Sequence, residues 1–424
     1  MMAGGAPART PFVYVDLETT GLSGGAGTHA FLVGCGGFDE DGEFVTRQYV
    51  MTRYADERAL LAAVACELSR AGALVSFNGK SFDAPVLETR YLFHRLEWAA
   101  RGLPHLDVLH PARRFWGRAC GDASGRRREA RGGRDASTSS VSSRAAWRDE
   151  ASARDSLEPT APGVGPRRRE DRGAPREIRN DVTPCSLTAL EQQVLGARRS
   201  RDVPGFEIPA RYFQFVRSGD PRPLAAVLEH NRLDLLSLAG LTAQLLYLVN
   251  EGAEAARDPR EALALGGLYA RSGNDVRARD AYERAVSGRA SAIGAASIAV
   301  TGENAGSIAA SKENAASIAA IRINALRALA IMSRRARRYD EAAQCWRRLL
   351  DVSGCPAHVV REATEALAIH HEHRLRDLTM AKVFALRSLE HGPHPAWTDA
   401  VRYRLARIER KMAGAANGNA RLEF

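Results

Sequence analysis

The residues of this chain best suited to chemistry are acids in three separate segments, and the first pair is Asp16 and Glu18 in the run FVYVDLETTG. The apolar residues of this run predict a β-strand. Side chains two positions apart on a strand point to the same face, so both carboxylates should lie together. Adjacent acids repel each other and are tolerated best when a divalent cation compensates them. The pair alone is also compatible with two solvated acids at a strand end.

The second acidic segment is ALVSFNGKSFDAPVL, which predicts a strand ending at Asn78, a short turn and a helix beginning at Asp83. The helix dipole favours a carboxylate at this position, and that could be the whole role of Asp83. The alternative is that Asp83 faces Asp16 across the sheet edge and shares its cation.

The third segment is EHNRLDLL, where His230 and Asp234 are four residues apart on a predicted helix and therefore share one face. An imidazole one turn before a carboxylate can be an ordinary surface pair. It can also be a general base beside a metal ligand.

The elements that must position these acids alternate between strand and helix patterns. The runs FVYVDL, AFLVGCGGF and FVTRQYVM predict three strands, and amphipathic runs then alternate with ALVSFN and HLDVL. The pattern predicts an α/β domain over residues 11–250, with a mixed sheet flanked by helices and closed by the long helix PLAAVLEHNRLDLLSLAGLTAQLLYLV. Residues 1–10 are expected to be disordered.

Residues 117–180 interrupt this domain with Arg, Ser, Gly and Ala in no regular period. This segment has too few aliphatic side chains to bury the surface that would offset its entropy of ordering. We therefore expect a disordered insertion.

From residue 255 to 412 the sequence predicts only helices, with tetratricopeptide-like repeats. The motif L-G-x-x-Y…A-x-x-x-F-x-x-A is matched by Leu265, Gly266, Tyr269, Ala278, Tyr282 and Ala285. Near-copies of one ten-residue unit, such as TGENAGSIAA and SKENAASIAA, suggest a low-complexity insertion at 291–320. Residues 413–424 are expected to form a disordered tail.

The bulk composition indicates a water-soluble protein. The net charge is +10, which suits a polyanionic partner, although all but four of the 60 basic residues are arginines and could reflect compositional bias. The six cysteines form no C-x-x-C pair and are expected to be free thiols. No secretory signal and no long apolar run is evident, so we expect a cytoplasmic protein without a membrane partner.

Taken in order, the three acidic segments resemble the motifs of the DEDD exonuclease superfamily, which has a ribonuclease H-like fold. Asp16 and Glu18 match D-x-E, while Asn78 and Asp83 fall in a match to N-x-x-x-F-D. The third motif, an aromatic residue or His followed by Asp, matches His230 and Asp234; Asp107 stands at a non-liganding Asp of the superfamily.

The resemblance implies a 3′–5′ exonuclease that acts on a nucleic acid with a 3′ end. Its four carboxylates would hold two divalent cations, Mg²⁺ or Mn²⁺, and His230 would act on the attacking water. Asn78 and Lys80 would contact the terminal nucleotide or its phosphate, unless Asn78 serves to cap the turn.

The segments FNGKSFDAPVLETR and DVPGFEIPARYF also resemble YprB-type ribonuclease H-like proteins, some of which carry tetratricopeptide repeats. The spacing of His230 and Asp234 is that of the tyrosine subclass of DEDD enzymes, yet a histidine replaces the tyrosine. The resemblance thus implies a ribonuclease H-like exonuclease domain followed by an all-α tetratricopeptide-like solenoid, which would bind a protein partner.

Two competing functions remain open. A catalytically idle nucleic-acid-binding or scaffold protein would act through its helical repeats, and a fold alone does not guarantee activity. An endonuclease acting on RNA–DNA hybrids would share the fold and cations but would cut internally. The sequence does not distinguish DNA from RNA, because that choice depends on the shape of the pocket.

Overall fold

The computed structural model describes residues 7–21, 27–117, 185–200, 202–288, 307–390 and 395–419. Most of the expected insertion at 117–180 therefore lies outside the described residues. So do residues 1–6, residues 289–306 and residues 420–424.

A five-stranded mixed sheet forms the first part of the chain. Its strands are β1 (Phe12–Thr19), β2 (Ala30–Phe38), β3 (Phe44–Val50), β4 (Ala73–Ser76) and β5 (His105–Asp107). They lie in the order β3-β2-β1-β4-β5. β1, β2 and β3 pair antiparallel as a meander, while β4 and β5 extend the sheet in parallel with β1. This is the combination of meander and crossover connections that the sequence predicts.

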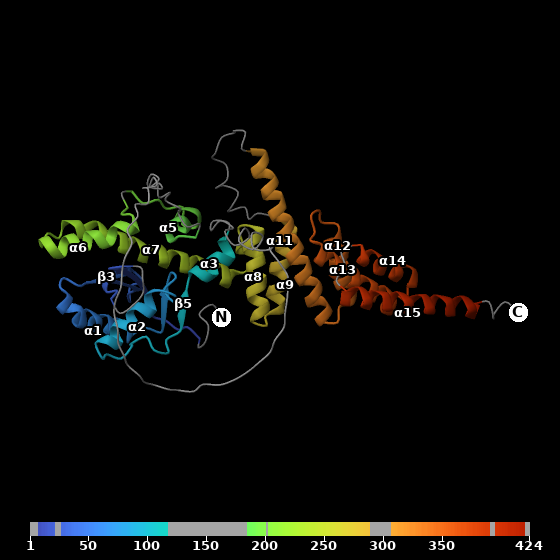
Figure 1. Cartoon of the computed structure of the whole chain (residues 1–424), viewed down its shortest axis with the longest axis horizontal. Coiled ribbons are helices and arrows are strands. Elements are labelled where there is room, and N and C mark those ends of the chain that lie inside the picture. The colour runs from blue at the N-terminus through green and yellow to red at the C-terminus, as the bar shows by residue number, and fades with distance from the viewer. Residues whose placement is uncertain are drawn as a thin grey trace, which may run out of the picture.

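Helices and short turns connect and cover the strands. They are η1 (Tyr54–Asp56), α1 (Glu57–Leu68), α2 (Asp83–Phe93), α3 (Leu109–Trp116), α5 (Leu187–Leu190), η2 (Glu191–Leu195), η3 (Gly205–Glu207), α6 (Ile208–Ser218) and α7 (Arg222–Glu251). The side chains of Val13, Val15 and Leu17 on β1 pack in one core with α1, α2 and α6. The long helix α7 crosses β1, β2 and β3 (Figure 1).

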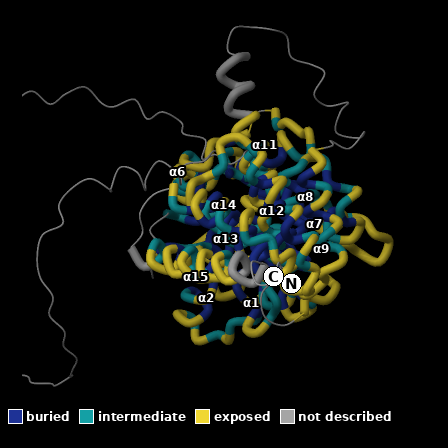
Figure 2. The backbone as a smooth tube through the Cα atoms, turned by 90° about the vertical axis from the view of Figure 1, so that its right-hand side faces the viewer, coloured by how far each residue is buried: buried dark blue, intermediate teal, exposed yellow. Residues whose placement is uncertain are grey.

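The second part of the chain is helical. After η4 (Ala253–Ala255) come α8 (Pro259–Arg271), α9 (Asp275–Ser287), α11 (Ser307–Arg335), α12 (Tyr339–Leu350), α13 (Ala357–His370), η5 (His371–Leu375), α14 (Leu378–Leu389) and α15 (Pro395–Asn419). α8 packs on α9, α11 on α12 and α13 on α14, so consecutive helices form hairpins (Figure 1). The buried residues lie inside this stack and the exposed residues on its outer side (Figure 2).

The structure describes part of one expected segment of the helical part and moves the expected end of another. The expected low-complexity insertion at 291–320 is helical from Ser307 onward, as the first half of α11. α15 continues to Asn419, beyond the expected end at Met412. Both segments are rich in alanine, which has the highest helix propensity, so low complexity and loss of helical structure are not equivalent here.

The sheet and the first helical hairpins share one hydrophobic core. Leu245 and Leu248 on α7 are buried in the same cluster as Leu265 and Leu268 on α8. A hydrogen bond from Trp116 Nε1 to Glu261 Oε1, at 2.8 Å, joins α3 to α8 inside this contact. The helical part is therefore packed onto the sheet domain rather than joined to it by a free linker.

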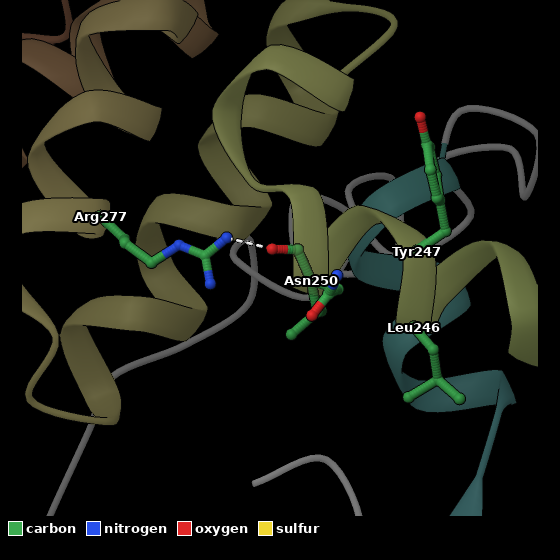
Figure 3. Close-up of a pocket in the computed structure, with 5 residues that line it drawn as sticks. Leu246, Tyr247, Asn250 and Arg277 are labelled. Carbon is green, nitrogen blue, oxygen red and sulfur yellow. Dashed lines mark hydrogen bonds between the residues drawn. The ribbon is translucent and has the colours of Figure 1, made fainter.

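Beside this junction the surface is hollowed between the end of α7 and α9. The open hollow of about 590 Å³ is lined by Leu246, Tyr247, Val249, Asn250 and Arg277. Arg277 donates a hydrogen bond to the backbone carbonyl of Asn250 across it (Figure 3). Leu246 lies about 18 Å along α7 from Asp234, at ~1.5 Å per residue, so the hollow is separate from the acidic residues.

Two of the long helices are apolar enough to bear on the expectation of no membrane partner. By length and composition, two helices among the described residues could span a membrane, α7 and the segment Ala315–Arg335 of α11. The core helices of globular proteins pass the same test, and α7 packs on the sheet. The absence of a membrane partner stays a prediction.

Cys185 is disulfide-bonded, so the expectation of a free thiol is wrong there; Cys35, Cys66, Cys345 and Cys355 are free.

Candidate active site

β1 carries Asp16 and Glu18 on the sheet face that α7 covers. The alternation of the strand places Tyr14, Asp16 and Glu18 on that face, opposite Val13, Val15 and Leu17. Burial, followed by the negative charges of Asp234, Glu18 and Asp83, raises the pKa of Asp16 well above its usual range. Burial and the neighbouring acids likewise raise the pKa of Glu18 to about 8.

A glycine on β2 lets α7 approach these acids closely. Gly34 pairs with Asp16 across the sheet, and a Cβ at Gly34 would lie 2.2 Å from Oδ1 of Asn231 on α7. Asn231 Nδ2 donates to Asp16 Oδ2 at 2.8 Å, and Asn231 Oδ1 accepts from Gln48 Nε2 at 2.9 Å. The completely buried Asn231 thus holds one oxygen of Asp16 in place.

The turn after β4 places Asp83 at the first residue of α2. Asp107 holds this turn, because its carboxylate accepts from the backbone N–H of Asn78 at 2.8 Å and of Lys80 at 3.1 Å. Asn78 has a left-handed backbone with φ of 65°, and a Cβ at Gly79 would lie 3.0 Å from Asp83 Oδ2. Burial and the charge of Asp107 raise the pKa of Asp83 to about 7.

α7 supplies His230 and Asp234 from one face, one helical turn apart. His230 Nε2 lies 3.5 Å from Asp234 Oδ2 and 4.0 Å from Glu18 Oε1. Burial raises the pKa of Asp234, although His230 and Arg199 act in the opposite direction. The imidazole therefore stands between the acid of the helix and the acid of the strand.

Arg199 enters the site from the segment between η2 and α6, and only 3% of its side chain is exposed. Its Nη2 lies 2.5 Å from Asp234 Oδ1, its Nη1 3.2 Å from Asp202 Oδ2 and its Nε 2.8 Å from Glu191 Oε2. The planar guanidinium thus uses each of its nitrogens to hold acids from three different segments.

The comparison with protein families agrees with this geometry. The RNase_H superfamily matches residues 13–121 and 175–246, which include all five strands except Phe12 at the start of β1, together with Asp16, Glu18, Asp83 and Asp234. The mixed sheet and its flanking helices fit a ribonuclease H-like domain.

The chain is also similar to a curated protein. The chain is 28% identical over 255 residues to the uncharacterized protein YprB of Bacillus subtilis strain 168, an alignment that covers 59% of this chain and 46% of YprB. The chain thus spans about half the length of the curated relative it matches. No solved structure gives a significant match.

The donor set of the sheet domain fits hard divalent cations. Asp16, Glu18, Asp83 and Asp234 offer only carboxylate oxygens, the ligands that magnesium and manganese prefer. Each has a raised pKa, so each would gain from a nearby positive charge. Among the described residues no three His, Cys, Asp or Glu side chains already form a metal-binding group. One oxygen of Asp16 accepts from Asn231 and one oxygen of Asp234 contacts Arg199.

The structure brings together five of the sequence-based site residues: Asp16, Glu18, Asp83, His230 and Asp234. Asn78 and Lys80 are exposed on the turn beside Asp83, where their backbone N–H groups bind Asp107. Sequence reasoning missed Arg199, Asp202 and Asn231. Asn231 directly follows His230 in the third motif, and Asp202 opens the DVPG segment of the YprB-like pattern; Arg199 carried no such signal.

Proposed function

We propose that this protein is a metal-dependent 3′–5′ exonuclease of the DEDD type. The match of the sheet domain to the RNase_H superfamily supports a nucleic-acid hydrolase. The observation that supports the finer proposal is that four buried acids from three distant segments lie close together: Asp16, Glu18, Asp83 and Asp234. The negative charges of its neighbours help to raise the pKa of Asp16 and of Glu18. Such a concentration of buried acids is typical of a functional site.

The four carboxylates would hold two divalent cations, magnesium or manganese. Bound there, the cations would supply Lewis-acid stabilisation of the charge that develops on the scissile phosphate. Asn231 and Arg199 keep one oxygen each of Asp16 and Asp234 in a fixed position, so the remaining oxygens are presented to the site. Preorganised ligands reduce the rearrangement that the reaction requires.

His230 is the proton acceptor in this proposal. As the water oxygen attacks phosphorus, the water proton passes to His230 Nε2, which faces the acids. The new P–O bond forms while the bond between phosphorus and the 3′ oxygen of the preceding nucleotide breaks. The leaving 3′ oxygen takes a proton from solvent, so the products are a nucleoside 5′-monophosphate and a strand shortened by one nucleotide.

The exposed turn beside Asp83 is the proposed contact for the end of the substrate. Asn78 and Lys80 project from this turn, whose backbone is fixed by Asp107. The Lys80 ammonium group suits a terminal phosphate, and the Asn78 amide suits the edge of a base. Neither group selects between DNA and RNA.

The helical part is proposed to be a tetratricopeptide-like solenoid that binds a protein partner. Support comes from the α8–α9 hairpin, where a Cβ at Gly266 would lie 2.5 Å from the Tyr282 ring. The glycine of the repeat motif is thus required for the aromatic residue of the next helix to pack. Stacked hairpins of this kind form extended surfaces suited to peptides.

Incubation of the full-length protein with single-stranded and duplex DNA and RNA, labelled at either end, tests this proposal. An exonuclease releases mononucleotides from the 3′ end in magnesium or manganese and stops in EDTA. Internal cuts would identify an endonuclease. Binding without cleavage in every condition would instead favour a scaffold that acts through its helices.

A further inference from the structure

Outside the motifs compared above, one acid contacts the proposed proton acceptor directly. Asp202 lies between η2 and α6, and its Oδ1 is 2.6 Å from His230 Nδ1. This is shorter than the 3.5 Å and 4.0 Å that separate His230 Nε2 from Asp234 and Glu18. The strongest contact of the imidazole is therefore made on the side opposite the acidic site.

The chemistry of the two groups fixes the direction of this hydrogen bond. Burial alone would raise the pKa of Asp202, but the hydrogen bond from His230 and the charges of His230 and Arg199 lower it. An ionised carboxylate has no proton to give, so Nδ1 must carry the proton and donate it. The nitrogen that can gain or lose a proton is then Nε2, which faces Glu18 and Asp234.

Asp202 is itself held rigidly. Its Oδ2 lies 3.2 Å from Arg199 Nη1, and its Oδ1 accepts from the backbone N–H of Val203 at 2.9 Å. Arg199 is anchored in turn by Glu191 and Asp234. The position of the Asp202 carboxylate is therefore fixed both by the buried Arg199 guanidinium and by the backbone N–H of Val203.

We propose that Asp202 is a positioning residue that fixes the orientation and the Nδ1-protonated tautomer of His230, so that Nε2 is presented to the attacking water. This inference rests on the proposed hydrolase function, since it assigns Asp202 a task only if His230 accepts a proton. Arg199 retains two other acidic partners when Asp202 is removed, so loss of Asp202 leaves no buried charge unpaired.

The tautomer can be measured without metal and without turnover. Full-length protein labelled with ¹⁵N-histidine gives distinct long-range ¹H–¹⁵N signals for the two tautomers, and the His230→Gln variant identifies the signals of His230. Wild type should show proton occupancy at Nδ1. Asp202→Ala should shift the population toward the Nε2-protonated form, whereas Asp220→Asn, which neutralises a partly exposed acid paired with Arg222 near the start of α7, should not. An unchanged spectrum in Asp202→Ala would overturn the proposal.

Kinetics then separate positioning from a structural role. Loss of a group that orients a functional histidine costs about 10–100-fold, and Asp202→Ala should lower kcat by that factor with unchanged substrate Kd. Asp202→Glu should recover part of the rate. In a His230→Ala background the same substitution should have no further effect, because both residues act through one ring. Equal losses in both backgrounds would contradict the proposal. A wild type without nuclease activity would refute the proposed function, while the tautomer measurement would still decide whether Asp202 orients His230.

Discussion

Two regions of this protein bury carboxylates in opposite ways. Glu57, at the start of α1, accepts from Arg90 Nε at 2.6 Å and lies 2.7 Å from His94 Nε2 and 3.0 Å from His29 Nδ1. Burial tends to raise its pKa, but these partners outweigh burial and lower the pKa to about 2. Asp16 and Glu18, at the other face of the sheet, have neighbours that are mostly acids, and their pKa values rise.

A second acid follows the pattern of Glu57. Glu372 in the helical part is fully buried and contacts Arg407 and Lys411, which outweigh burial and lower its pKa to about 2. Buried acids outside the candidate site, such as Glu57 and Glu372, are thus paired with arginine or lysine side chains of the same chain. Among the described residues at the end of β1, Arg199 and His230 contact Asp234. In the proposed function, the charge of the remaining acids would be balanced by divalent cations.

The largest effect is expected when one acid of the candidate site is made neutral. Asp16→Asn should lower the nuclease rate by at least about 10³-fold, because stabilisation of transition-state charge by bound cations is worth several kcal/mol. The fold should be kept or stabilised, since one source of repulsion is removed. Single-turnover cleavage and thermal denaturation measure both quantities. Asp41→Asn, on the exposed hairpin after β2, is the matched control; equal activity in the two variants would remove Asp16 from the site.

Removal of the imidazole should come next. His230→Ala should lower kcat by about 10²–10⁴-fold with little change in substrate affinity, as is usual for a general base. His230→Tyr should restore part of the rate, because the spacing to Asp234 is that of the tyrosine subclass. An alanine variant within a few-fold of wild type would show that the histidine only packs beside the sheet.

The structural acids should respond in stability rather than in activity. Glu57→Gln removes the negative charge that contacts the buried Arg90 guanidinium, and breaking such a buried pair costs about 3–5 kcal/mol. Urea denaturation measures this loss, with Glu40→Gln on the exposed β2–β3 turn as the control. A loss no larger than that of the control would mean that the two regions do not differ as described.

The pH dependence of stability should have opposite signs in the two regions. Glu18 and Asp83, with pKa values of about 8 and about 7, keep protons in the folded state that the unfolded chain has released. Their contribution to the free energy of unfolding of cation-free protein therefore falls as pH rises from about 4 to about 8. Glu57 and Glu372 contribute stability that is present above about pH 4.5 and is lost as pH falls toward about 2. Between pH 4 and 8 the slope should be smaller in Glu18→Gln than in wild type, because Asp83 still contributes, and it should be unchanged in Glu57→Gln.

The sequence was informative where local patterns decide the geometry. Alternation on β1 predicted that Asp16 and Glu18 share a face, and helical spacing predicted the same for His230 and Asp234. Ser186 caps α5 as a serine before an apolar run should, since its hydroxyl accepts from the backbone N–H of Ala189.

Contacts between segments that are distant in the sequence could not be predicted. Nothing in the order of residues reveals that Arg199 bridges Asp234 and Asp202, because an arginine in an arginine-rich chain has no local signature. The close approach of Asn231 to Gly34 likewise depends on how α7 crosses the sheet. Composition was misleading at the end of α15, where a disordered tail was expected from residue 413 but the helix continues to Asn419, since alanine has a high helix propensity.

Calorimetric titration of manganese into cation-free protein at pH 7.5 shows whether the acids at the end of β1 bind divalent cations. We expect saturable binding of two ions by wild type and by Asp41→Asn, and a rise in melting temperature as the sites fill. Asp16→Asn should lose at least one of the ions and most of that rise. Absence of binding by wild type, or identical binding by Asp16→Asn, would show that these acids do not form a cation site.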